Sequence, residues 1–124
     1  MGVLQTVTDL VQGKTKPGER RDPAWQKVKN EWLKDHHECA ACGATTKLQV
    51  HHKNPFHLHP DQELDPNNFI TLCETSNHGV ICHLLFGHLG DYRSFNDNVV
   101  SDASAWRTKI DGRPKDDDGT GSIV

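Results

Sequence analysis

Near the start of the chain, apolar residues recur at helical spacing. Within residues 23–35, Trp25, Val28 and Trp32 would share one face of a helix, with polar residues on the other faces. Asp22-Pro23 before them is typical of an N-cap followed by proline at the first helical position. The pattern therefore predicts an amphipathic helix that packs one face on a core.

Two further helices are predicted in the second half of the chain. A short one is expected over residues 80–86, and Gly87 fits its C-terminal stop. A longer one is expected over residues 99–110. Its predicted apolar stripe consists of Val100, Ala103, Trp106 and Ile110.

Between these helices, two short apolar segments read as strands. They are residues 48–51 and 69–72, and a proline-containing loop over residues 53–68 separates them. We expect the two strands to pair across this loop. A loop of that length inside a compact domain is usually functional or disordered.

Composition limits how such a domain can be stabilised. Only 34% of the residues are hydrophobic and the mean hydropathy is −0.71, so the core of a 124-residue chain would be thin. Small domains with thin cores often add a metal ion or disulfides. Four cysteines and nine histidines are available for this purpose.

Charge and breaker residues divide the chain into three parts. Residues 1–21 are predicted to be a flexible basic arm, residues 22–110 the folded domain, and residues 111–124 a disordered acidic tail. The formal charge of −3 excludes a uniformly basic nucleic-acid binder. The basic residues near the start could contact phosphates, or could form a solvated helix face.

Targeting signals are not apparent. No segment has the layout of a signal peptide, and no apolar run approaches membrane-spanning length. We therefore expect a cytoplasmic protein, as in a bacterial or phage-infected cell, with no membrane partner. In that reducing compartment a Cys-x-x-Cys pair more often holds metal than forms a disulfide.

The cysteine spacing predicts a structural zinc site. Cys39 and Cys42 form a Cys-x-x-Cys turn, and Cys73 and Cys82 would supply the second pair of ligands. His78 is a rival for the fourth position, and four buried cysteines without metal are the plainer alternative. Four protein ligands leave no open position, so this zinc would stabilise the fold rather than take part in catalysis.

A second candidate site is built from histidines. His51 and His52 end the first predicted strand, where neighbouring side chains point to opposite faces unless the strand distorts. One imidazole can bind a divalent ion while an uncoordinated one accepts a proton near neutral pH. His83, beside zinc ligand Cys82, is well placed to supply a second metal ligand.

Several segments together resemble the HNH endonuclease family, which has a ββα-metal fold. The resemblance covers about fifty residues, from Cys39 to His88, and rests on their order and spacing. The matching segments are Cys39-x-x-Cys42, Val50-His51-His52, the run from Leu64 to Cys73, and Cys82-His83. The resemblance implies a small α+β domain with a ββα-metal core over residues 39–88, stapled by zinc and flanked by N- and C-terminal helices.

The resemblance also implies roles for single residues. His51 and His83 would bind the catalytic divalent ion, His52 would be the general base, and Asn68 would hold the loop that orients this base. The ion could be Mg²⁺, Mn²⁺, Ni²⁺ or Zn²⁺. DNA would be the substrate, and products would carry 5′-phosphate and 3′-hydroxyl ends.

Two departures from the family pattern affect these roles. Relatives often separate the last two cysteines by two residues, whereas residues 74–81 form an insertion here. Relatives also often carry a histidine at the position of Gly87. His88 is offset from His83 by about 140° on a regular helix, so it could join the metal only if the helix ends or bulges near Gly87. Contact with phosphate or packing are its alternatives.

Three functions remain open from the sequence. The leading one is metal-dependent hydrolysis of DNA phosphodiester bonds, with specificity supplied by a partner such as a phage-packaging or restriction protein. The second is a zinc-stabilised DNA- or protein-binding module without catalysis. The third, a redox or metal-sensing protein, lacks the βαβ context that usually accompanies its Cys-x-x-Cys motif.

Overall fold

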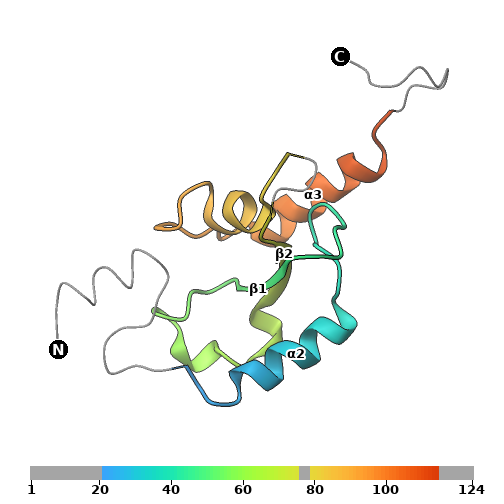
Figure 1. Ribbon diagram of the computed structural model, residues 1–124. Coiled ribbons are helices and arrows are strands. Elements are labelled where there is room, and N and C mark those ends of the chain that lie inside the picture. The colour runs from blue at the N-terminus through green and yellow to red at the C-terminus, as the bar shows by residue number, and fades with distance from the viewer. Residues whose placement is uncertain (1–20, 76–78, 115–124) are drawn as a thin grey trace.

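The computed structural model describes residues 21–75 and 79–114 (Figure 1). The predictions for the basic arm up to residue 20, for His78 and for residues 115–124 lie outside these residues. Within them, the elements run α2, β1, η1, η2, β2, η3 and α3 along the chain.

A two-stranded antiparallel sheet forms the centre of the described chain. Strand β1 (Leu48–His52) pairs with β2 (Phe69–Cys73), so that His52 lies opposite Phe69 and Leu48 opposite Cys73. Both strands run one residue further than predicted. Every residue of β2 is buried, because helices cover both faces of the sheet.

Helix α2 (Trp25–Asp35) packs against one face of this sheet. Trp25 and Trp32 each meet the Phe69 ring edge-on, with centroids 5.5 and 5.4 Å apart. The indole N–H of Trp32 also donates to the Thr71 hydroxyl at 2.9 Å. The helix begins two residues later than predicted, because Asp22 caps a preceding turn by accepting from the Ala24 N–H.

The loop between the strands contains two short 3₁₀ helices, η1 (Pro60–Gln62) and η2 (Pro66–Asn68). Buried Asn68 ties this loop together. Its Oδ1 accepts from the Asn54 N–H at 2.8 Å, while its Nδ2 donates to the carbonyls of Asn54 and Gln62 at 3.1 and 3.3 Å. These hydrogen bonds satisfy backbone groups of the loop, which has no strand partner to bond with.

The other face of the sheet is covered by η3 and α3 (Figure 1). The helix predicted over residues 80–86 is instead a π-helix, η3 (His83–Gly87), and Gly87 lies inside it rather than at its stop. Buried Asn96 joins η3 to α3. Its Nδ2 donates to the Phe86 carbonyl and to Asp102, both at 2.8 Å.

Helix α3 (Val99–Asp111) matches its predicted position, and its buried face differs from the predicted one at its first residue. Val99 and Ala103 are buried and Trp106 is half-buried, whereas Val100 is 52% exposed. The predicted stripe is therefore confirmed at Ala103, Trp106 and Ile110 and wrong only at Val100. Val99 and Val100 both fit the helical spacing at the start of the stripe, and Val99 is the one that joins the core cluster with Ile70 and Ala41.

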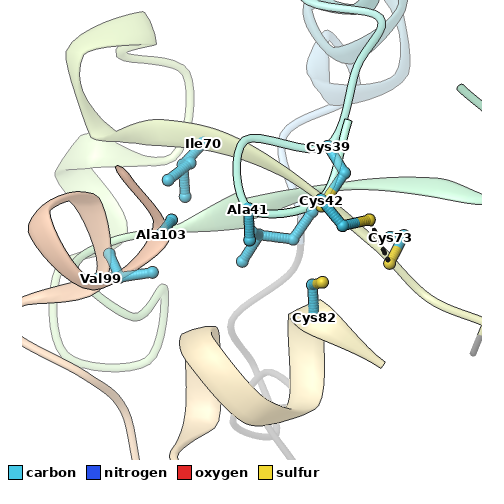
Figure 2. Packing of buried hydrophobic residues seen from close by; sticks show 9 residues of the cluster. Cys39, Ala41, Cys42, Ile70, Cys73, Cys82, Val99 and Ala103 are labelled. Carbon is cyan, nitrogen blue, oxygen red and sulfur yellow. Dashed lines mark hydrogen bonds between the residues drawn. The ribbon is translucent and has the colours of Figure 1, made fainter. Parts of the chain in front are cut away.

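The structure confirms a small α+β fold with a thin core. The four cysteines belong to this core beside Ile70, Val99 and Ala103 (Figure 2). No helix within the described ranges has the length and apolar character that crossing a bilayer requires.

Candidate metal centres

Four thiols converge between the Cys-x-x-Cys turn, the end of β2 and the start of η3. Figure 2 shows the thiols of Cys42, Cys73 and Cys82 directed toward one another. The sulfur atoms of Cys42 and Cys73 are 3.8 Å apart, and all four lie within 4.8 Å of one another. A tetrahedral ion with Zn–S bonds of about 2.3 Å needs sulfur separations of about 3.8 Å. The cluster of Cys39, Cys42, Cys73 and Cys82 therefore fits a structural zinc ion.

The electrostatics of the four thiols also favour a bound cation. A hydrogen bond from Cys82 lowers the pKa of Cys39 to about 4, and the same hydrogen bond, followed by burial, raises the pKa of Cys82. Burial raises the pKa of Cys42 to about 11. Hydrogen bonds from the neighbouring thiols can stabilise one buried thiolate, but a second thiolate beside it would be repelled by the first negative charge. Full deprotonation, which a tetrahedral zinc site requires, needs the positive charge of the ion.

Three histidines converge on the face of the sheet that η3 covers. Nε2 of His83 lies 3.1 Å from Nδ1 of His51 and 3.2 Å from Nε2 of His88. Imidazole nitrogens about 2.0–2.1 Å from one ion lie about 2.8–3.4 Å apart for octahedral to tetrahedral angles. We refer to His51, His83 and His88 as the histidine cluster; its two short separations fit one divalent ion.

The π-helix explains how His88 reaches this cluster. In an α-helix residues four apart share a face, and the i→i+5 bonding of a π-turn shifts this spacing to five. His83 and His88 thus lie one above the other. Gly87 leaves the room that His51 needs, because a Cβ there would stand 2.9 Å from the His51 ring.

The hydrogen bonds of His83 and His88 show which ring nitrogens are free to bind an ion. Nδ1 of His88 donates to the Ser94 carbonyl at 2.8 Å, and Nδ1 of His83 donates to the Glu74 carboxylate. Neutral rings then carry lone pairs on both Nε2 atoms, which face each other. Only a positive species between them, a proton or a metal ion, removes this repulsion.

His51 is kept neutral, which metal binding requires. Burial, followed by the nearby charges of His83 and His88, lowers the pKa of His51 to about 2, so the ring is neutral near pH 7. Its Nδ1 faces the cluster. Its Nε2 is buried and finds no hydrogen-bond partner within the described part of the chain.

His52 lies on the opposite face of the strand. β1 stays regular through His52, so the distortion that would place both histidines on one face is absent. Nε2 of His52 lies 2.9 Å from the Glu63 carbonyl oxygen, which can only accept, so Nε2 carries the proton and Nδ1 the lone pair. The ring packs against Trp25 at 4.7 Å, and burial lowers its pKa.

Both histidines nevertheless open into one cleft of about 260 Å³. It follows residues 49–52 at the edge of β1 that does not pair with β2, with α2 on one side and η3 on the other. A larger, mainly apolar hollow of about 460 Å³ lies beside the end of α2, but it contains none of the histidine cluster. Chemistry therefore assigns the smaller cleft as the candidate site.

Several residues of this cleft were not predicted from the sequence. Arg21, placed in the arm, contacts Glu63 at 3.4 Å and lies over the Phe56 ring at 4.5 Å. Lys29, His57 and Tyr92 also line the cleft, and Glu74 holds His83 from behind. The position of Glu74, directly after a predicted zinc ligand, was the one signal that could have identified it.

Comparison with protein-family models, curated proteins and solved structures found no match to this chain. The geometry of the two centres and the cleft is therefore what indicates a function. The structure shows a small α+β domain with a buried cysteine cluster and a converging set of three histidines.

Proposed function

We propose that this chain is a metal-dependent endonuclease of the HNH type, which hydrolyses DNA phosphodiester bonds. One observation carries the proposal: a histidine cluster with metal-ligand spacing and an uncoordinated, oriented histidine open into the same cleft. A metal ion that only stabilised the fold would not need a separate proton acceptor beside it.

In this proposal His52 is the general base. Its Nε2–H is bound to the Glu63 carbonyl, which leaves Nδ1 to take a proton from the attacking water. Asn68 acts through the loop, because it bonds the Gln62 carbonyl next to Glu63. Water attacks phosphorus, the bond to the 3′ oxygen breaks, and a 5′-phosphate results.

The histidine cluster would hold the ion through His51, His83 and His88. A divalent ion bound there stabilises charge that develops on the phosphate and on the leaving 3′ oxygen. Lys29 supplies positive charge at the α2 side of the cleft, where the DNA backbone would pass, beside Arg21, whose charge is offset by Glu63.

The test is cleavage of supercoiled plasmid by zinc-loaded wild type and by His52→Ala, with EDTA, Mg²⁺, Mn²⁺, Ni²⁺ or Zn²⁺. We expect metal-dependent nicking or linearisation by wild type. His52→Ala should cut about 10²–10⁴-fold more slowly, which is the usual contribution of general-base catalysis.

His59→Ala is the matched control, since it removes a histidine from the same loop region without touching the cluster or His52. It should cut like wild type. Equal cutting by His52→Ala would exclude His52 as the base. No cutting in any metal by folded wild type, with DNA binding retained, would favour the non-catalytic binding module.

A further inference from the structure

Glu74 makes two side-chain contacts behind the histidine cluster. Its Oε2 accepts from Nδ1 of His83, and its Oε1 accepts from the Tyr92 hydroxyl at 3.0 Å. Both carboxylate oxygens of Glu74 therefore accept a hydrogen bond, and these two bonds fix the orientation of the carboxylate.

The backbone around Glu74 is also fixed. Glu74 directly follows Cys73, and its N–H donates to the Lys47 carbonyl at 2.7 Å, which continues the sheet ladder by one bond. His83 directly follows Cys82. The same cysteine cluster therefore anchors both partners of the Glu74–His83 contact, one residue away on each side.

Such a contact controls how an imidazole binds metal. A carboxylate that accepts from Nδ1–H keeps the proton on that nitrogen, leaves Nε2 for the ion and makes the ring more basic. Loss of an outer partner of this kind typically weakens metal affinity by about 10–100-fold.

We propose that Glu74 is a positioning residue for the divalent ion of the histidine cluster, and that Tyr92 orients its carboxylate. This inference rests on the metal centre in the proposed function. It assigns a role to the first residue of the insertion between Cys73 and Cys82, a segment that the family resemblance left without one.

The test measures Ni²⁺ binding by calorimetry in full-length chain already loaded with one zinc ion. Glu74→Ala should weaken Ni²⁺ binding by about 10–100-fold. Glu74→Gln keeps an acceptor for the Nδ1–H of His83 without the negative charge, so it should lose less Ni²⁺ affinity than Glu74→Ala. Tyr92→Phe should lose less Ni²⁺ affinity than Glu74→Gln. His83→Ala identifies which binding event belongs to the histidine cluster.

A second readout needs no metal at the histidines. Imidazole ¹⁵N spectra of the zinc-loaded protein should show His83 protonated at Nδ1 in wild type and no longer fixed there in Glu74→Ala. Asp61→Asn is the control, because it removes one negative charge from exposed η1. It should change neither readout.

The outcomes separate the two proposals. Wild-type Ni²⁺ affinity and an unchanged His83 tautomer in Glu74→Ala would overturn the positioning role and leave the nuclease proposal standing. If Glu74→Ala fails to retain zinc or to fold, the Ni²⁺ affinity and the His83 tautomer of Glu74→Gln and Tyr92→Phe are compared with those of wild type instead. Absence of Ni²⁺ binding at the cluster in folded wild type would overturn both proposals, whereas binding without DNA cleavage would contradict only the nuclease.

Discussion

At the scale of single residues, the central feature is that His51 and His52 are neighbours with different environments. The regular strand sends His51 to the η3 side, among other imidazoles, and His52 to the α2 side, against Trp25 and the Glu63 carbonyl. Strand alternation thus separates a candidate metal-ligand position from the proposed proton-acceptor position within two residues. The free edge of β1 lets both reach the same cleft.

Gly87 provides a residue-scale prediction. In Gly87→Ala the new Cβ would lie 2.9–3.2 Å from three atoms of the His51 ring, which must move away from the cluster. Overpacking costs about 1–3 kcal/mol, while replacing glycine by alanine in a helix regains about 1 kcal/mol. We therefore expect stability to fall by at most about 2 kcal/mol, and Ni²⁺ affinity, measured by calorimetry, to fall by at least tenfold.

The His51→Ala background is the control for this clash. With the ring removed, Gly87→Ala should leave stability unchanged or raise it by up to about 1 kcal/mol in urea unfolding. A similar loss of stability in both backgrounds would show that the π-turn itself, and not His51, excludes a side chain at this position.

At the scale of elements, two irregular segments build the site. The π-helix η3 converts a five-residue separation into a shared face, and so brings His88 to His83. The loop between the strands carries the Glu63 carbonyl to His52, and the three hydrogen bonds of Asn68 hold that loop in place. The sequence predicted a helix near η3 but not its π-turn, and the loop has no apolar period from which its path could be predicted.

Asn68→Ala tests the role of the loop. It removes three hydrogen bonds from a buried site next to Glu63, so His52 should lose its fixed orientation. We expect the cleavage rate to fall by about 10–100-fold, less than removal of the whole base would cost. Affinity for a DNA duplex, measured by fluorescence anisotropy in Ca²⁺, should change by less than threefold.

Asn67→Ala is the adjacent control. The Asn67 side chain is exposed, and the bond from its backbone N–H to Asp65 survives the substitution. Its rate and affinity should match wild type. Parallel losses of rate and DNA affinity in Asn68→Ala would indicate that the loop binds DNA rather than orients His52.

At the scale of the whole molecule, the cysteine cluster takes the place of a larger apolar core. It joins the turn after α2 to the end of β2 and the start of η3, three segments that share few large apolar contacts. Structural zinc contributes about 10–16 kcal/mol in small domains, which matches or exceeds the whole stability of a typical protein. The bound ion and the fold are therefore expected to form together.

Cys39→Ser tests this dependence. We expect this variant to lose the bound zinc, measured by atomic emission, and to lose cooperative thermal unfolding. With only three cysteine ligands, zinc binding no longer offsets the conformational entropy that the chain loses on folding. Ala41→Ser places the same hydroxyl at a buried position of the same turn that is no ligand. That control should keep its zinc and lose about 1–3 kcal/mol. Full stability of zinc-free Cys39→Ser would refute the scaffold role.

The sequence by itself determined the two strands, α2 and α3 through their local period, and it indicated the cysteine set through its ligand spacing, while the small α+β class followed from the family resemblance. It also predicted most of the buried face of α3, but not that Val99 rather than Val100 begins it. Only the tertiary structure brought His88 to His83, Glu74 behind His83, and Arg21 to Glu63. These contacts join residues through a π-turn, an insertion and the segment before α2, where no periodic pattern records which side chains will meet.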